Sequence, residues 1–345
     1  MPNRIKVGLL THAGGAHVGA YLQALAAADR CSEVVLADPD DRWEQDARRV
    51  LGEKLKHVSR DHRAALREHK PQLALITMEA RLAPPIIDAT LEADCHVFAE
   101  KPACVRAEDF APLVQKADMK HRYLMLALAN RTNPEIVAAR EIFASKKIGK
   151  LYGIEMHLIA DQTRLTRPSY HQQWFAQKAR AGGGHLIWLG IHWLDLAMYI
   201  TDESISEVAG FTTNVGGQPI DIEDSATAAL RFEGGTLGTV TSGYYLDKGY
   251  HSHIKIWGSD GWILIEPMKD QPLSWYTTKG EDAGKVQTVD EPKEPRGYTP
   301  FVSEAIRACA DMGEPPINNA HSLRALKTVF AIYTSADTGR TTKIQ

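Results

Sequence analysis

The feature that most constrains the fold is an alternation of short apolar runs with helical patterns over about the first 130 residues. Because parallel strands need a long crossover connection, usually a helix, this alternation predicts βαβ units and a parallel sheet. Doubly wound sheets of this kind bind ligands at the carboxyl ends of their strands. The expected strands are 5–10, 33–37, 73–78, 97–99 and 123–129, and the expected helices are 18–27, 41–55, 62–68, 85–93 and 107–116.

The pattern changes after Asn130, Arg131 and Pro134. A helical pattern at 135–145 is followed by long strand-like segments in succession, which favours a mainly antiparallel sheet. The sequence therefore predicts a doubly wound α/β domain over 1–128 and an α+β domain with an open, mainly antiparallel sheet over 129–345. The later strands are expected at 151–159, 208–213, 226–232, 236–244, 253–257 and 262–266, with exposed loops or hairpins at 268–297 and a last helix at 322–334.

Charge and cysteine usage argue against a nucleic-acid-binding protein, a disulfide-rich protein and a zinc-cluster protein. A formal net charge of -3 gives no indication of a nucleic-acid or anionic-membrane partner. The four cysteines form no CxxC pair, so we expect reduced, mostly buried thiols and neither a disulfide framework nor a zinc cluster. The N-terminus runs into an apolar strand without a signal-peptide pattern, and no apolar stretch reaches membrane-span length. A cytoplasmic protein is the expectation.

A glycine-bearing turn follows the first strand. On a GxGxxG pattern the glycine positions hold Thr11, Ala13 and Ala16, while Gly14 and Gly15 supply the backbone freedom between them. The match is poor, but the turn lies between a strand and a helix N-terminus, whose exposed N–H groups favour a pyrophosphate.

Two further signals follow later strands. Asp38 lies 23 residues beyond Gly15, where a carboxylate binds ribose hydroxyls and favours NAD over NADP; a helix cap is the alternative. Glu100, Lys101 and Pro102 follow another strand. A lysine there can donate to a substrate oxygen, although a surface lysine is the commoner case.

Residues 182–200 read GGGHLIWLGIHWLDLAMYI, three glycines leading an apolar helix with a stripe of functional groups. At about 100° per residue these groups fall within roughly 80° of one another. A helix that is apolar nearly all round is normally buried, so they are either satisfied in the core or grouped around a ligand. The stripe consists of His185, Trp188, His192, Asp195 and Tyr199.

A long loop before the glycines carries groups that suit a polyhydroxylated or acidic ligand, with a lid or subunit contact as the alternative. These groups are Arg164, Arg167, Tyr170, His171 and Trp174. His251 and His253 share a strand face, and His12 and His17 lie at the nucleotide turn, but nothing completes a recognisable metal site. No metal is predicted.

Together these motifs resemble the Gfo/Idh/MocA oxidoreductases, and the likeness covers nearly the whole chain. It also includes Ile148-Gly149-Lys150, Glu223-Asp224 before a strand, and the tail from Tyr333 to Arg340. The resemblance implies a Rossmann domain followed by an open-faced sheet domain, and NAD(P) chemistry on sugars, polyols or their derivatives. It also implies homodimers or homotetramers built through the C-terminal sheet.

The resemblance implies that Lys101 and His192 lie beside the substrate hydroxyl and the nicotinamide. The family often has an aspartate four residues before that histidine, where this chain has Trp188, so the usual proton relay does not transfer intact. Trp188 offers a face for sugar C–H groups or is plain core, and Asp195 is either a substitute for orienting His192 or structural. The expected substrate-binding residues are His185, Trp188, Asp195, Arg131, Tyr170 and Trp174. The expected cofactor-binding residues are Thr11, His12, Ala13, Gly14, Gly15, Ala16, Asp38, Met78, Glu100, Lys101 and Asn130.

The sequence leaves three functions open. The first is an NAD-dependent dehydrogenase or reductase of a sugar or polyol, with NADP as the alternative cofactor. The second keeps NAD tightly bound and uses transient oxidation to drive an elimination or a glycosidic cleavage, and the third is a non-catalytic dinucleotide-binding sensor. Lys101 and His192 in matching contexts favour the first.

Overall fold

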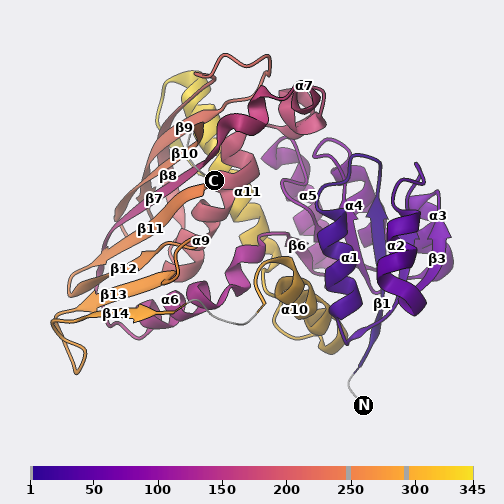
Figure 1. Cartoon of the computed structure of the whole chain (residues 1–345), viewed down its shortest axis with the longest axis horizontal. Helices are drawn as coiled ribbons and strands as arrows, with labels where there is room; N and C mark the ends of the chain where they lie inside the picture. Colours follow the sequence, from indigo (N-terminus) through magenta and orange to yellow (C-terminus); the bar gives the residue numbers. More distant parts are fainter. Residues whose placement is uncertain (1–2, 246–249, 291–294, 345) are drawn as a thin grey trace. The chain divides into compact units, whose positions relative to one another are not determined.

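The computed structural model describes residues 3–245, 250–290 and 295–344 (Figure 1). It divides into two compact units. The first comprises Met1–Thr132, Lys178–Gly182 and Pro295–Leu323, and the second comprises Asn133–Gln177, Gly183–Glu294 and Arg324–Gln345. The two later segments of the first unit fall within the 129–345 stretch that the sequence assigned to one domain.

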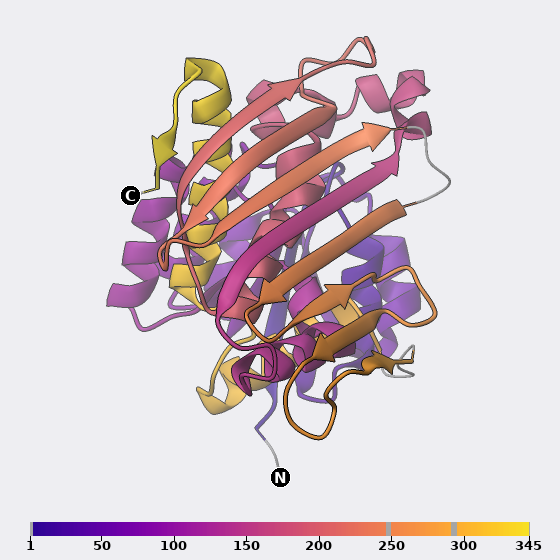
Figure 2. The same cartoon turned by 90° about the vertical axis from the view of Figure 1, so that its left-hand side faces the viewer.

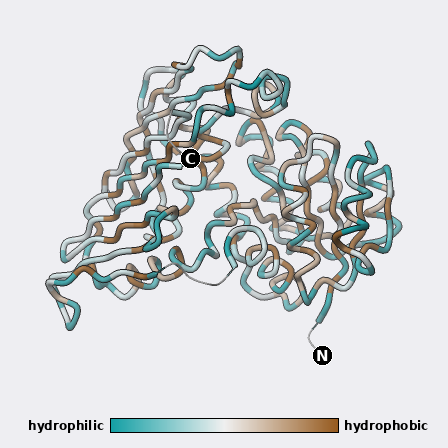
Figure 3. The backbone as a smooth tube through the Cα atoms, viewed as in Figure 1, coloured by the Kyte–Doolittle hydropathy of each residue, from teal (hydrophilic) through white to brown (hydrophobic). Residues whose placement is uncertain are grey.

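The first unit contains a six-stranded parallel sheet in the order β3-β2-β1-β4-β5-β6, which confirms the doubly wound α/β prediction. The order reverses beside β1, and such a switch point is where doubly wound sheets bind ligands. Figure 3 shows hydrophobic residues concentrated along these strands. The strands are β1 (Ile5–Thr11), β2 (Cys31–Ala37), β3 (Leu55–Ser59), β4 (Leu73–Thr77), β5 (His96–Ala99) and β6 (Leu124–Leu126). The helices are α1 (Val18–Ala27), α2 (Glu44–Leu51), α3 (His62–His69), α4 (Ala83–Glu92) and α5 (Ala107–Met119).

The continuous helix expected over 41–55 was wrong. The structure has α2 from Glu44, a 3₁₀ turn at Gly52–Lys54, and then the edge strand β3, which the sequence analysis did not predict. Gly52 adopts a φ of 52°, a backbone conformation that glycine reaches without a steric penalty. This residue ends the helix and lets the chain turn into β3.

The second unit contains a nine-stranded sheet in the order β14-β13-β12-β11-β7-β10-β9-β8-β15. Its pairs are antiparallel apart from β10 with β7, which confirms a mainly antiparallel sheet. The 268–297 region contains the hairpin of β13 and β14. The strands are β7 (Leu151–Asp161), β8 (Ile205–Thr213), β9 (Ser225–Phe232), β10 (Leu237–Tyr245), β11 (Tyr250–Gly258), β12 (Gly261–Ile265), β13 (Leu273–Thr277), β14 (Val286–Val289) and β15 (Thr342–Lys343).

Helices cover one face of this sheet and leave the other open (Figures 1 and 2). The covering helices are α6 (Pro134–Ala144), α9 (Ile191–Thr201) and α11 (Asn319–Thr338). Along β9, buried residues such as Leu230 and Phe232 alternate with exposed ones. The open face carries large exposed hydrophobic side chains, among them Phe211, Leu237 and Trp257.

Three further helices were not predicted. α10 (Tyr298–Asp311) packs against α1 in the first unit, where Tyr298 meets Tyr21 edge to face with ring centroids 5.0 Å apart. The long loop before the glycines contains two short helices, α7 (Pro168–His171) and α8 (Lys178–Ala181).

All four cysteines are buried and none forms a disulfide. Within residues 3–245, 250–290 and 295–344 no helix has the length and apolar character needed to cross a bilayer. Over the same residues no three His, Cys, Asp or Glu side chains gather into a group that could hold a metal ion.

Candidate active site

The helix after the three glycines does not begin as a regular α-helix. Leu186–Gly190 form a π-helical turn, and α9 follows from Ile191. The spacing of 100° per residue therefore does not hold across the whole stripe, because a π turn is wider than an α turn. Trp188, His192 and Tyr199 are partly exposed, whereas His185 and Asp195 are fully buried. π turns inside helices occur frequently at functional sites.

The glycines that lead this helix are required by close packing. A Cβ on Gly183 would lie 2.2 Å from the Tyr333 hydroxyl oxygen, and a Cβ on Gly184 would lie 2.0 Å from the Glu223 backbone oxygen. The Glu223 carboxylate itself accepts a hydrogen bond from the Gly184 N–H at 2.6 Å. A protein carboxylate thus occupies the N-terminus of this helix, so a phosphate does not bind there.

His185 lies in the interior of the second unit. Its Nδ1 is 2.6 Å from the Ser242 hydroxyl oxygen, and its ring meets Tyr244 edge to face at 4.4 Å. These contacts hold the His185 ring in the core of the second unit. Substrate contacts of His185 and of the buried Asp195 remain predictions, as does the ability of Asp195 to orient His192.

Trp188 belongs to a cluster of aromatic rings. Its ring centroid lies 5.4 Å from that of Trp174 and 5.4 Å from that of Phe175, and Phe175 lies 5.0 Å from Tyr170. These separations are typical of favourable aromatic pairs. The structure therefore brings together three of the predicted substrate-binding residues, and it adds Phe175, which the sequence analysis passed over although it follows Trp174 directly.

Arg164 and Tyr250 lie near these rings. Arg164 donates to the Tyr250 hydroxyl at 3.0 Å and its guanidinium carbon lies 5.2 Å from the Tyr244 ring centroid. Tyr244 and Tyr170 share a hydrophobic cluster with Leu165 and Leu189. Burial raises the pKa of Tyr170, so its hydroxyl stays protonated at neutral pH.

In the first unit, the turn after β1 packs tightly on the strand ends. A Cβ on Gly15 would lie 2.3 Å from the Thr11 hydroxyl oxygen and 2.9 Å from the Thr77 backbone oxygen, so only glycine fits there. The imidazole of His12 accepts at Nε2 from the Glu79 backbone N–H, with 3.1 Å between the nitrogens. Burial lowers the pKa of His12, which favours this neutral, accepting form.

Asp38 and Asp40 both bind backbone N–H groups near this turn. The buried Asp38 accepts from the Trp43 backbone N–H at 2.7 Å, and both the ribose-binding and the capping roles remain predictions. Asp40 accepts from Ala13 N at 2.8 Å. Asp40 therefore contacts the nucleotide turn directly, a contact that the sequence analysis did not predict.

Glu100 and Lys101 are buried after the carboxyl end of β5, and the Lys101–Pro102 peptide is cis. The Glu100 carboxylate accepts a hydrogen bond from the Tyr21 hydroxyl and lies 3.3 Å from His17 Nδ1. Burial and the Glu100 charge raise the pKa of Tyr21 well above its ordinary value, so Tyr21 remains a donor. This network joins the loop that carries Lys101 to the start of α1.

The remaining predicted residues of the first unit are also mostly buried. Arg131 lies with its Nη1 3.3 Å from His321 Nδ1 and 3.5 Å from the Pro316 backbone oxygen, and Met78 is buried beside Glu79. Glu79 forms a bidentate ion pair with Arg180, whose Nε lies 3.0 Å from one carboxylate oxygen. This pair anchors α8 to the end of β4.

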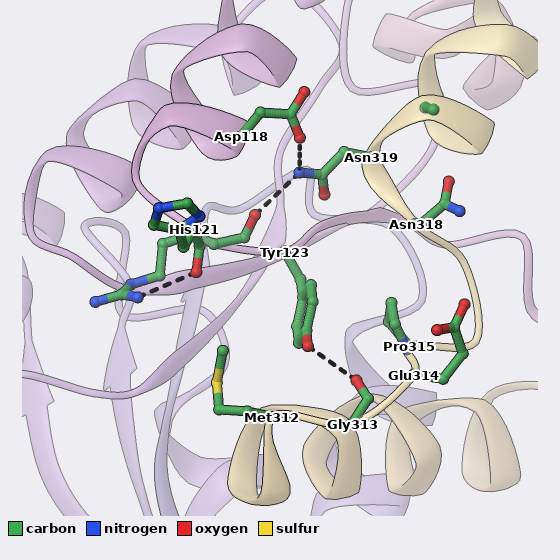
Figure 4. A pocket seen from close by; sticks show the side chains of 11 residues that line it. Asp118, His121, Tyr123, Met312, Gly313, Glu314, Pro315, Asn318 and Asn319 are labelled. Atoms are coloured by element: carbon green, nitrogen blue, oxygen red, sulfur yellow. Dashed lines mark hydrogen bonds between the residues drawn. The ribbon is translucent and has the colours of Figure 1, made fainter.

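A cavity of about 590 Å³ lies elsewhere in the first unit (Figure 4). It is lined by the end of α5, the residues just before β6 and the connection from α10 to α11. Asn319 bridges Asp118 and the Arg122 backbone oxygen at 2.7 and 3.0 Å, and Tyr123 donates to the Gly313 oxygen at 2.8 Å. The cavity is at the amino ends of the strands, the edge opposite to that at which such sheets bind ligands.

Comparison with known proteins gives matches along most of the chain. Residues 8–128 match a family model described as an oxidoreductase family with an NAD-binding Rossmann fold, and residues 136–264 match a GFO/IDH/MocA C-terminal domain. A myo-inositol 2-dehydrogenase from Thermotoga maritima is 22% identical over 308 residues, 87% of this chain and 89% of that protein.

Solved structures share the fold over the full length. An oxidoreductase domain protein from Kribbella flavida aligns with a TM-score of 0.89 at 24% identity, covering 100% of both chains. A levoglucosan dehydrogenase in complex with NADH and L-sorbose aligns with a TM-score of 0.87 at 21% identity, again covering 100% of both chains. At these identities the likeness establishes the fold.

Proposed function

This chain belongs to the Gfo/Idh/MocA family of NAD-binding oxidoreductases, and from that premise we propose that it transfers hydride between NAD(P) and a CH–OH carbon of a sugar, polyol or sugar derivative. The observation that carries the proposal is the partly exposed His192 on the helix after the glycines. Histidine is the commonest general acid–base group, and alcohol oxidation needs a group that takes the hydroxyl proton.

The chain's own residues handle the proton and the oxygen. His192 accepts the hydroxyl proton as hydride leaves the same carbon, and in the reverse direction it returns that proton. Lys101 donates to the substrate oxygen and stabilises the negative charge that develops there. Bound NAD supplies the hydride acceptor, while the chain orients it.

The nucleotide turn fits a dinucleotide. The N-terminus of α1 carries no acidic residue in its first turn, and it follows β1 directly beside the switch point. Its positive end would favour the pyrophosphate, and Asp38 at the end of β2 would favour the unphosphorylated ribose of NAD. Met78, Glu100 and Asn130 complete the proposed cofactor contacts, together with the turn from Thr11 to Ala16.

Trp188 and its aromatic neighbours support a carbohydrate substrate. The C–H face of a sugar ring packs on an aromatic ring, and Trp188 lies four residues before His192. One dehydrogenase similar to this chain, the myo-inositol 2-dehydrogenase, is named for a cyclic polyol, whose ring also has apolar C–H groups. We therefore assign Trp188, Tyr170 and Trp174 to the substrate side of the site.

The test is a screen of sugars, inositols and glycosides with NAD and with NADP, followed at the nicotinamide absorbance. We expect net NADH formation with at least one polyol, and stronger activity with NAD than with NADP. Absence of NAD(H) and NADP(H) binding in a direct titration would refute the proposal. Turnover of substrate with no added cofactor and no net formation of NADH would instead indicate the second function, in which tightly bound NAD is transiently reduced and then reoxidised.

The exposed hydrophobic side chains on the open sheet face support a homo-oligomer formed through that face. They lie on β8, β10 and β11 of one sheet, and exposed hydrophobic side chains on a sheet face are typical of a surface that pairs with another copy. The four buried thiols are consistent with a reducing, cytoplasmic setting, which we also propose.

A further inference from the structure

The start of the helix that carries His192 leaves four backbone N–H groups without partners inside the helix, as every helix does. Here each of them finds a partner elsewhere in the second unit. Gly184 N donates to Glu223 Oε2 at 2.6 Å, and Leu186 N donates to Glu223 Oε1 at 3.0 Å. His185 N donates to the Glu223 backbone oxygen at 3.2 Å, and Ile187 N to the Tyr333 hydroxyl at 3.1 Å.

Glu223 and Tyr333 also bind each other. The Tyr333 hydroxyl donates to Glu223 Oε1 at 2.8 Å, and both side chains are buried. Burial and the neighbouring carboxylate raise the pKa of Tyr333 well above its ordinary value, so its proton stays available for this bond. Burial raises the pKa of Glu223, while its hydrogen bonds from Tyr333 and the backbone favour the charged form.

This arrangement differs from an ordinary N-cap, in which one residue just before the helix binds one or two N–H groups. Glu223 comes from the segment before β9 and Tyr333 from α11, so two distant parts of the sequence fix the helix start. Gly183 and Gly184 make the close approach sterically feasible. Trp188 N to Gly184 O, at 3.0 Å, is the first bond within the helical segment.

The π turn explains why an external cap matters here. Leu186–Gly190 form a turn with one residue more than an α turn, and such turns persist only where the surroundings hold them. Relaxation to an α turn would shift the residues before the turn by one position, a rotation of about 100°, relative to α9, which carries His192.

We propose that Glu223, supported by Tyr333, is the positioning residue that holds the start of this helix and its π turn, and so fixes the positions of Trp188 and His192 in the site. The inference rests on the proposed function for its catalytic consequence. Its structural part, the cap itself, can be measured without turnover.

The test compares Glu223→Gln with the parent enzyme and with Asp61→Asn as a matched control. The glutamine keeps the shape of the side chain but turns an NH₂ toward a backbone N–H. Asp61 caps α3 by accepting from Ala64 N at 2.9 Å and lies outside the proposed site. Both variants lose one helix cap, and only one of these helices carries His192.

For Glu223→Gln we expect kcat to fall between about 10-fold and 100-fold while the Kd of NADH changes less than about twofold. Amide exchange at residues 184–187 should accelerate, and the NMR titration of the His192 imidazole should shift. Glu223→Ala should regain activity with added formate, a carboxylate small enough for the vacated space, and chloride should give no rescue. Asp61→Asn should leave kcat and the His192 titration unchanged.

Three outcomes would overturn the inference: unchanged exchange at 184–187, an unchanged His192 titration, or an unchanged kcat. An equal loss of kcat in Asp61→Asn would also overturn it, because the effect would then be general destabilisation. If the parent enzyme oxidises no sugar or polyol, the proposed function fails, and exchange together with the His192 titration still decides the role of Glu223.

Discussion

Single residues set the chemistry proposed for this protein, and the role of His192 can be tested most directly. Replacing His192 by Ala removes the group that takes the hydroxyl proton, so we expect kcat/KM to fall about 10²-fold to 10⁴-fold with NADH binding unchanged. Steady-state kinetics and a fluorescence titration with NADH give the two quantities. The exposed His57→Ala serves as control, and a His192 variant within threefold of the parent kcat/KM would remove the assignment.

A second histidine offers a prediction about stability. His96 is buried at the start of β5, where its Nδ1 accepts from Tyr123 N at 3.0 Å. Burial, with the nearby charge of Arg122, lowers its pKa from 6.5 to about 4. Between those two pH values the unfolded chain binds a proton that the folded chain does not, so stability falls as the pH decreases from 6.5 toward 4.

Protonation of His96 accounts for a loss of about 3 kcal/mol in the free energy of unfolding between pH 6.5 and pH 4. His96→Asn keeps an acceptor for Tyr123 N but does not titrate. Urea unfolding at pH 7 and pH 4 should therefore show a smaller loss of unfolding free energy in the variant than in the parent. His121→Asn controls for loss of an exposed imidazole, and parallel pH dependences in parent and His96→Asn would contradict the assignment.

At the residue scale, the sequence identifies candidate site residues where the signal is local, and it misses roles that depend on distant partners. Trp174 and Tyr170 could be selected because an aromatic, charged loop precedes the glycines. The capping role of Glu223 could not, because it depends on contacts with a helix 39 residues away and with Tyr333 on α11. His185 shows the same limit, since only the fold reveals its bond to Ser242.

At the scale of elements, the glycines before α9 lead to a direct test. Ala at position 184 would place its Cβ 2.0 Å from the Glu223 backbone oxygen, an atom that cannot move without shifting the chain. We expect Gly184→Ala to lower the free energy of unfolding by about 1–3 kcal/mol. Thermal or urea unfolding measures this change.

The control for Gly184→Ala is Gly19→Ala. A Cβ on Gly19 would meet nothing within 4 Å, and the residue lies inside α1. Alanine there should be neutral or stabilising by about 0.5–1 kcal/mol, because it lowers the entropy of the unfolded chain. Equal effects of the two substitutions would show that the space around Gly184 is not the determinant.

Helices and strands were predicted correctly where the hydrophobic pattern is regular, and they were missed where it is weak or interrupted. The first helix was predicted at the residues where α1 lies, because its apolar spacing is regular and a turn precedes it. β3 was missed because its pattern of exposed and half-buried residues lacks the apolar run of a central strand. α10 was missed although Phe301, Ala305 and Cys309 recur at helical spacing, since a charged, Pro-rich stretch directly precedes them.

At the scale of the whole molecule, the open sheet face predicts self-association. Phe211 on β8 is 74% exposed, and so is Met119 at the end of α5 in the first unit. Glutamate at Phe211 would bury a charge if two sheets pair, whereas glutamate at Met119 would not. We expect Phe211→Glu to reduce the mass measured by light scattering and Met119→Glu to leave it unchanged, and a parent protein that is monomeric at all concentrations would rule out the pairing.

The chain passes between its two units at five points, after residues 132, 177, 182, 294 and 323. α10, which packs on α1, is therefore encoded more than 250 residues after its neighbour. A chimera that joined residues 1–128 of this chain to the remainder of a relative would pair Tyr21 with a foreign α10. Recombination between relatives at a single crossover near residue 128 would thus separate α1 from the α10 with which it packs, so the first unit is inherited whole only when its three segments are exchanged together.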